Sequence, residues 1–296
     1  MTLSEYRKYF AAELADLYTL SESAELFSIF IEKLTGHNKF AQRQIQQERL
    51  TEKETAHLEV ILRELKRGKP FQQILGETEF FCLKFFVNEH VLIPRPETEE
   101  LLEVAIEKIK NSDFHGKDFK ILDIGTGSGI IPIVLKKYFP EAQVFAIDYS
   151  EEALKTAKRN ANFHKVEIEL IHQDYLNADL RDVFDVIISN PPYIAQQEES
   201  EIAASVKEFE PKMALFSPTN NALVFYEKIA KDCEKHLSED GLVFLEINQK
   251  LGKETRELFS DVLSETFLLK DISGNERMVW GRKYGWRERS ERRKVL

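Results

Sequence analysis

A tetrapeptide in the middle of the chain, Asn190-Pro191-Pro192-Tyr193, has the residue types needed to bind and activate a planar nitrogen group. The nitrogen of an amide or aryl amine is a poor nucleophile because its lone pair is delocalised. The side-chain oxygen of Asn190 can accept one N–H, and the rigid turn made by two prolines can aim the carbonyl of Pro191 at the other. Tyr193 can supply a wall for the planar group. We therefore expect catalysis by positioning and electrostatic preorganisation, without a metal.

A glycine-rich loop at residues 123–129 is the second candidate site. Its glycines allow a tight turn and let a ligand approach the backbone closely, and the helix expected after it offers free N–H groups. The third glycine comes one residue earlier than in the dinucleotide-binding pattern, which disfavours a nicotinamide cofactor. Such a loop alone could be only a tight turn. Asp123 can orient it, and the candidate ligand-binding residues are Gly125, Thr126, Gly127, Ser128 and Gly129.

Acidic residues end the next two expected strands, where ligands bind in sheets of this kind. Asp148 can hold ribose hydroxyls. Asp174 can reach an adenine amino group, and Tyr175 can cover the ring. Together with the glycine loop, these features resemble class I S-adenosylmethionine-dependent methyltransferases. That resemblance implies S-adenosylmethionine as the cofactor, S-adenosylhomocysteine as its product and no metal, with the glycine loop around the methionine end.

The elements that must position these residues follow an alternating pattern from residue 119 onward. Short apolar runs alternate with helical segments, which predicts a doubly wound, mostly parallel α/β sheet of Rossmann-like type. The strands expected are 119–125, 143–148, 166–171, 184–189 and 241–247, with two antiparallel strands within 267–282. The helices expected are 130–138, 151–163, 221–237 and 251–263. A Pro-Pro pair could simply end a strand, but this one follows the fourth strand at the ligand-binding edge.

The first 68 or so residues are predicted to be helical, because apolar side chains recur at helical spacing. Thr51 and Glu54 form a capping box, and Gly68 stands where a left-handed residue ends a helix. Three apolar stripes are expected to build the core of this part: Tyr6, Phe10, Leu14 and Leu17; Phe27, Phe30, Ile31 and Leu34; and Leu58, Ile61, Leu62 and Leu65.

A change of pattern after residue 70 sets the domain organisation. Residues 71–92 alternate like a β-hairpin, two prolines at 94 and 96 then keep the backbone extended, and helical spacing resumes at 97–109. We expect a helical substrate-recognition domain (1–70), a hairpin linker (71–93), a methyltransferase domain (94–283) and a basic tail (284–296). The tail is a solvated terminus or, alternatively, an electrostatic contact for an RNA-rich partner.

Composition limits the remaining function classes. The formal net charge of −10 disfavours broad contact with nucleic acid. Cys82 and Cys233 lie far apart, which excludes a disulfide framework and a thiolate zinc site and fits a reducing compartment. The N-terminus lacks the apolar core of a signal peptide, and no run approaches the length of a membrane span. We expect a cytoplasmic protein that does not contact membranes.

Four further segments separate two groups of enzymes that share the NPPY motif. One group methylates exocyclic amines of DNA bases, and the other, the HemK/PrmC family, methylates a glutamine of peptide chain release factors. The sequence resembles the second group over nearly its whole length, up to about residue 283. The matching segments are the hairpin region QQILGETEFFCLKFFVNEHVLIPRP (72–96), LIPRPETEELLE (92–103), FEPKMAL (209–215) and SGNER (273–277).

The resemblance implies a substrate and roles for named residues. Members methylate the side-chain amide nitrogen (N5) of the glutamine in the GGQ motif of class I release factors, which would be bound by residues 190–193. Arg95 and Thr98 would belong to a segment that closes over the cofactor, and Glu210 and Pro211 would shape the glutamine channel. Tyr175 stands where the family often has Trp or Phe. We expect a monomer that does not bind DNA directly.

Simpler readings stay open at this point. Arg95 could pair with Glu97 or Glu99, and Pro211 could only end a helix. A nucleic-acid amine methyltransferase would want a basic target-recognition region and a way to extract a base. A non-catalytic module of the same fold is disfavoured by the intact tetrapeptide and glycine loop.

Overall fold

The computed structural model describes residues 1–114, 116 and 118–284, and its contacts divide the chain into two compact units. The first comprises Met1–Glu77 together with Ala203–Phe209, and the second comprises Thr78–Ile202 and the chain from Glu210 onward. The short segment Ala203–Phe209 therefore belongs to the first unit, although the chain immediately before and after it belongs to the second. The expected basic tail lies outside the described residues except for residue 284.

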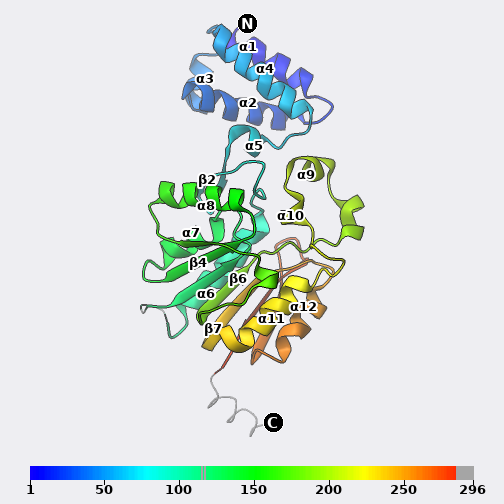
Figure 1. Ribbon diagram of the computed structural model, residues 1–296. Helices are drawn as coiled ribbons and strands as arrows, with labels where there is room; N and C mark the ends of the chain where they lie inside the picture. Colours follow the sequence, from blue (N-terminus) through cyan, green and yellow to red (C-terminus); the bar gives the residue numbers. More distant parts are fainter. Residues whose placement is uncertain (115, 117, 285–296) are drawn as a thin grey trace. The chain divides into compact units, whose positions relative to one another are not determined.

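The first unit is built mainly from helices (Figure 1). Capping boxes begin three of them, at Thr2, Thr19 and Thr51, where each threonine and the glutamate three residues later satisfy free backbone N–H groups. The helices are α1 (Leu3–Glu13), α2 (Leu20–Thr35), α3 (Lys39–Gln44), α4 (Glu52–Lys66), α5 (Phe71–Leu75) and α9 (Ala204–Phe209).

The core of this unit joins α1, α2 and α4 through the three expected stripes. Tyr6, Phe10 and Phe27 are fully buried, and the ring of Phe27 contacts the rings of both Tyr6 and Phe10. The prediction for Leu17 was wrong: α1 ends at Glu13, so helical spacing no longer carries Leu17 to the buried face, and it is 54% exposed. Residues 71–75, expected in the hairpin linker, form α5 instead.

The second unit contains a seven-stranded sheet and a short hairpin, of which only the first residue, Glu77, belongs to the first unit (Figure 1). The sheet has the order β5-β4-β3-β6-β7-β9-β8 and is parallel except for β9, which pairs antiparallel with both β7 and β8. The hairpin is β1 (Glu77–Phe80) and β2 (Leu83–Phe86). The sheet consists of β3 (Lys120–Ile124), β4 (Gln143–Asp148), β5 (Glu169–His172), β6 (Phe184–Ser189), β7 (Leu237–Glu246), β8 (Glu265–Lys270) and β9 (Glu276–Arg282). This confirms the predicted doubly wound architecture.

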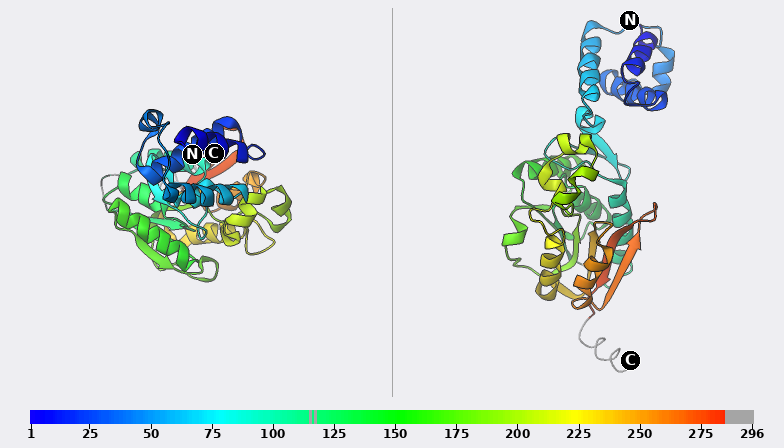
Figure 2. Two further views of the ribbon diagram at one scale, coloured as in Figure 1. Left: turned by 90° about the horizontal axis from the view of Figure 1, so that it is seen from above. Right: turned by 90° about the vertical axis from the view of Figure 1, so that its right-hand side faces the viewer.

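Helices cover both faces of this sheet (Figure 2). Successive residues of β3 show why: Ile121 packs in one apolar cluster with α6 and α7, whereas Leu122 packs in another with α11 and α12. A strand buried on both faces needs a continuous apolar run rather than an alternating one. The helices are α6 (Pro96–Lys110), α7 (Ile130–Tyr138), α8 (Glu151–His164), α11 (Val224–His236) and α12 (Gly252–Ser260).

Three short elements between β5 and α11 were not predicted: η1 (Tyr175–Asn177), η2 (Gln196–Glu201) and α10 (Lys212–Leu215). The equally short α9 of the first unit was missed as well. Each has six residues or fewer, which is too short to show a helical period. Among the residues the structure describes, no helix is long and apolar enough to cross a membrane.

The glycine loop generates a prediction about stability. Gly127 and Gly129 both have positive φ, but a Cβ on Gly129 would lie 3.0 Å from the Cβ of Ala157, whereas one on Gly127 would meet nothing within 4 Å. We expect Gly129→Ala to lower the free energy of unfolding by about 2–4 kcal/mol, because backbone strain and overpacking combine. The matched variant Gly127→Ala should lose only about 1–2 kcal/mol, since only the backbone is strained. Urea unfolding of both variants measures this, and equal losses would contradict it.

Candidate active site

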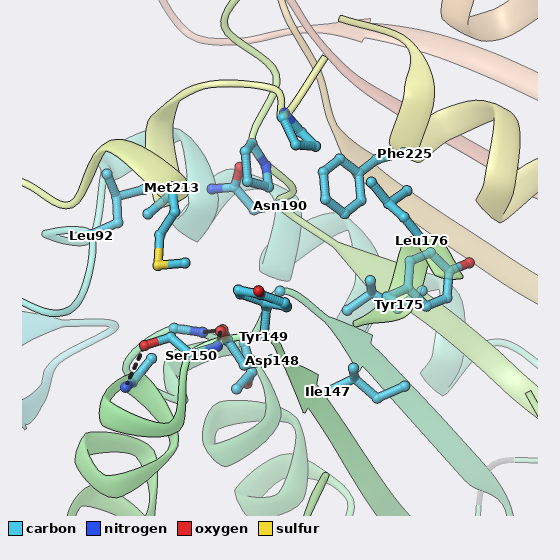
Figure 3. Close-up of a pocket in the computed structure, with 18 of the residues that line it drawn as sticks. Leu92, Ile147, Asp148, Tyr149, Ser150, Tyr175, Leu176, Asn190, Met213 and Phe225 are labelled. Atoms are coloured by element: carbon cyan, nitrogen blue, oxygen red, sulfur yellow. Dashed lines mark hydrogen bonds between the residues drawn. The ribbon is translucent and has the colours of Figure 1, made fainter. Parts of the chain in front are cut away.

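A cavity of about 910 Å³ opens in the second unit where β3, β4 and β6 end (Figure 3). Parallel strands bring their carboxyl ends to one edge, so the loops that follow them share this space. Most of the sequence-predicted residues line the cavity: Gly125, Thr126, Gly127, Ser128, Asp148, Asp174, Tyr175, Asn190 and Pro192. The predicted residues Gly129, Pro191, Tyr193, Glu210 and Pro211 are not among the lining residues.

Asp148 holds the glycine loop in its observed conformation. Its Oδ2 accepts from the backbone N of Gly127 at 2.7 Å, and its Oδ1 accepts from the backbone N of Ser150 at 2.8 Å. Burial raises the pKa of Asp148, while these backbone hydrogen bonds lower it. Gly125, Gly127 and Gly129 all have positive φ, and Gly129 begins α7. The carboxylate expected to hold a ribose therefore also organises the loop beside it.

Asp123 is a buried acid beneath the same loop. Neither of its carboxylate oxygens, nor the hydroxyl oxygen of Thr126, has a hydrogen-bond partner among the described residues. Burial raises the pKa of Asp123 to about 7, although the Thr126 hydroxyl, which lies near it without meeting the hydrogen-bond geometry, lowers it. Buried polar groups without partners are rare in folded proteins, so each of them calls for an explanation such as a bound molecule. Asp123 itself is fully buried and does not line the cavity, whereas Thr126 and the glycine loop do, so Asp123 would act on the cationic end of a ligand such as an amino acid from behind that loop.

Two tyrosines, Tyr149 and Tyr175, line the cavity and differ in their surroundings. Tyr175 is buried, and its hydroxyl donates to Oδ2 of Asp232 at 2.7 Å. Lys228 pairs with Asp232 at 2.6 Å and lies 4.9 Å from the Tyr175 ring centre. In Figure 3 the Tyr175 hydroxyl points away from the centre of the site, so only its ring is offered to the cavity. The sequence prediction missed Tyr149, which lines the cavity and is 61% exposed.

The tetrapeptide is anchored by a hydrogen-bonded chain that was not predicted. Nδ2 of Asn190 donates to Oγ1 of Thr98 at 3.1 Å, and that hydroxyl donates to Oε2 of Glu246 at 2.6 Å. The Tyr193 hydroxyl donates to Oε1 of the same carboxylate at 3.1 Å. Glu246 is buried at the end of β7, and burial raises its pKa. Tyr193, expected as a wall for the substrate, is thus hydrogen-bonded to the structure behind the site.

Glu210 fastens the proline-rich loop before α6 rather than lining the cavity. Its Oε1 accepts from Nη2 of Arg95 at 2.6 Å, and its Oε2 accepts from the backbone N of Ile93 at 3.0 Å. The Glu210 side chain is almost completely buried. Arg95 therefore pairs with Glu210, not with Glu97 or Glu99 as the simpler reading had it. Glu210 does not line the cavity, but three residues that follow it in the sequence do: Lys212, Met213 and Ala214.

A signal for the missed residues exists in the sequence. Tyr149 directly follows Asp148, and Glu246 is the last residue of an apolar strand, so both stand at the ligand-binding edge. The sequence does not indicate which residue Glu246 contacts, because its partner Thr98 lies 148 positions away in the chain.

Comparisons with known proteins agree with this geometry. The family model described as methyltransferase small domain matches residues 102–209. A release factor glutamine methyltransferase from Flavobacterium psychrophilum is 45% identical over 282 residues, which cover 94% of this chain and 98% of the relative. One from Lactococcus lactis is 40% identical, covering 82% and 88%.

Solved structures support the fold alone. The hMettl16 catalytic domain, in complex with MAT2A 3'UTR hairpin 6, aligns with a TM-score of 0.52 at 17% identity, covering 80% of this chain and 84% of that one. A methyltransferase from Pyrococcus furiosus aligns with a TM-score of 0.50 at 17% identity, covering 79% and 100%. With a methyltransferase sheet, a cavity beside its glycine loop and close relatives matched over nearly their whole length, the chain belongs to the release factor glutamine methyltransferase (HemK/PrmC) family of S-adenosylmethionine-dependent enzymes.

Proposed function

We propose that this protein methylates the side-chain amide nitrogen (N5) of the glutamine in the GGQ motif of class I peptide chain release factors, in support of translation termination. The observation that carries the proposal is the orientation of Asn190. Its amide nitrogen is engaged by Thr98, so its oxygen is left to accept an N–H from a molecule in the cavity. The relatives from Flavobacterium psychrophilum and Lactococcus lactis are release factor glutamine methyltransferases, which supplies the substrate class.

The cofactor would be held by the edge of the sheet. Residues 125–128 of the glycine loop, which line the cavity, suit the methionine end, with the buried Asp123 just before them in the chain, and Asp148 suits the ribose. Asp174 and the rings of Tyr149 and Tyr175 are available for the adenine. When bound, S-adenosylmethionine supplies an electrophilic methyl group attached to a sulfonium.

The chain's own residues would bind and orient the glutamine amide. Asn190 Oδ1 accepts a hydrogen bond from one N–H of the glutamine amide, and the backbone carbonyl of Pro191 is proposed to accept one from the other. Two acceptors hold the nitrogen with its lone pair directed at the methyl group, which is catalysis by orientation and electrostatic preorganisation. A strong base is not required, because the nitrogen becomes acidic as it is methylated and can release its proton to water.

The proposal also covers the oligomeric state of the protein, its cellular compartment and the unit that contacts the release factor. We infer a monomer that acts in the cytoplasm, and a role for the first unit in contacting the release factor. Two free cysteines, Cys82 on the surface and Cys233 in the core, suit a reducing compartment. The net charge of −10 disfavours DNA as the substrate.

A labelling experiment tests the substrate class. The protein is incubated with methyl-labelled S-adenosylmethionine and a class I release factor, a release factor with the GGQ glutamine replaced by alanine, or DNA. We expect label in the first sample only, because only it offers the amide. Label in DNA but not in the release factor would overturn the proposal.

A substitution tests the role of Asn190. We expect Asn190→Ala to lower turnover by about 10²–10³-fold, the loss typical of removing one preorganised polar contact to the reacting group. Binding of S-adenosylmethionine, measured by calorimetry, should persist. The matched control is Asn162→Ala on the exposed side of α8, which should keep wild-type turnover. Normal turnover in Asn190→Ala would contradict the assigned role.

A further inference from the structure

The hydrogen bonds behind Asn190 have a direction, and that direction determines what the cavity recognises. We propose that Thr98 and Glu246 are positioning residues that fix which end of the Asn190 side-chain amide faces the substrate. This inference rests on the proposed function for the identity of the substrate. The hydrogen bonds that link Asn190, Thr98 and Glu246 are present in the protein without any substrate.

The direction follows from the number of protons each group can donate. An ionised carboxylate only accepts hydrogen bonds, and a threonine hydroxyl has a single proton to give. Thr98 donates that proton to Glu246 at 2.6 Å, so towards Asn190 its oxygen can only accept. Asn190 must therefore turn its NH₂ group to Thr98, at 3.1 Å, and its oxygen the other way. A flipped amide would place an oxygen against an oxygen without a proton between them.

The carboxylate that sets this direction is held from several elements at once. Thr98 of α6 and Tyr193 of the tetrapeptide each donate a hydroxyl to it, at 2.6 and 3.1 Å. Tyr226 of α11 donates to the backbone oxygen of Glu246 at 3.0 Å. Arg277 of β9 lowers the pKa of Glu246 and Glu97 of α6 raises it, while burial is the largest influence and raises it. The two donated hydroxyls satisfy the buried carboxylate directly, while Arg277, whose own hydrogen bonds go to Asp271 and Gln249, contributes only a favourable charge.

The first and last residues of the tetrapeptide therefore depend on one group. Asn190 reaches Glu246 through Thr98, and Tyr193 reaches it directly. Asn248, two residues after Glu246, also donates to the backbone oxygen of Tyr193 at 3.2 Å. The end of β7 thus fixes both the backbone and the side chains of the segment that is proposed to bind glutamine.

This arrangement predicts a specificity determinant. An Asn190 oxygen facing the cavity favours a substrate group that carries N–H, such as the amide of glutamine. A freely flipping amide would present its NH₂ to the cavity part of the time and would accept a carboxylate equally well. Loss of the Thr98 hydroxyl should therefore reduce both the rate and the preference for glutamine over glutamate, because sites gain such discrimination from buried polar groups left unpaired by the wrong ligand.

Two substitutions of Thr98 separate the hydrogen bond from packing. Thr98→Val keeps the shape and removes the hydroxyl, and Thr98→Ser keeps the hydroxyl and removes a methyl group. We expect kcat on the release factor to fall by roughly 10- to 100-fold in Thr98→Val, the range for an unmade buried hydrogen bond, and to stay within about threefold of wild type in Thr98→Ser. The Kd for S-adenosylmethionine and the thermal unfolding midpoint are measured alongside.

A second measurement does not depend on the substrate. In nitrogen-15 NMR spectra of the protein alone, we expect the Asn190 side-chain NH₂ protons to exchange slowly with water, and to exchange faster in Thr98→Val but not in Thr98→Ser. If wild-type protein fails to methylate release factors, the proposed function fails, and these exchange rates still decide the role of Thr98.

Three results would overturn the inference. The first is kcat in Thr98→Val within about threefold of wild type. The second is an equal loss of kcat in Thr98→Ser and Thr98→Val, which would assign Thr98 a packing role. The third is fast exchange of the Asn190 side-chain amide protons with water in the wild-type protein. This third result decides the question by itself if the Thr98→Val variant does not fold.

Discussion

One buried carboxylate organises the catalytic segment of this protein. Glu246 accepts hydrogen bonds from the hydroxyls of Thr98 and Tyr193, and through Thr98 it determines how the Asn190 side-chain amide is oriented. A buried charge of this kind is costly unless every lone pair has a donor, so the groups around it have little freedom to rearrange. That constraint suits a reaction in which the protein contributes orientation rather than a base or a nucleophile. The polar groups are set before the substrate arrives, which is the basis of electrostatic preorganisation.

The sheet explains how distant segments meet at this point. The strands β3, β4, β6 and β7 run parallel, so the glycine loop, Asp148, Asn190 and Glu246 all emerge at one edge. The core beneath them is apolar on both faces of the sheet, which leaves the strand ends as the place for polar groups. Hydrogen bonds to carboxylates then hold the loops in place. Asp148 accepts a hydrogen bond from the backbone N–H of Gly127, and Glu210 accepts one from the guanidinium of Arg95. Each loop is thus held by a carboxylate from another part of the chain.

Much of this could be predicted from the sequence because it depends on local patterns. The strand of residues 184–189 and the helix of residues 130–138 fall where the apolar runs indicated. The capping box at Thr51 and the positive φ of Gly68 were likewise visible in the chain. The glycine loop and the tetrapeptide were found because their residue types are unusual and follow buried strands. Leu17 was misplaced because periodicity does not show where a helix ends.

The unpredicted part of the site consists of long-range pairs. Thr98 and Glu246, and likewise Arg95 and Glu210, lie more than 100 positions apart, and nothing local selects one partner over another. The surroundings of Tyr175 were hidden for the same reason, since its hydroxyl is committed to Asp232 on α11. A motif therefore identifies which residues act, whereas the fold decides which end of each side chain is available.

The central claim is that the cavity presents acceptors to a planar N–H group. It is tested most directly by the affinity of the protein, loaded with S-adenosylhomocysteine, for a release factor with its natural GGQ glutamine and for one with that glutamine replaced by glutamate. The two side chains have nearly the same shape, but glutamate offers oxygen where the glutamine offers N–H. We predict that binding of the glutamate variant is weaker by about 100-fold, because acceptors would face acceptors. Equal affinity for the two release factors would contradict the account.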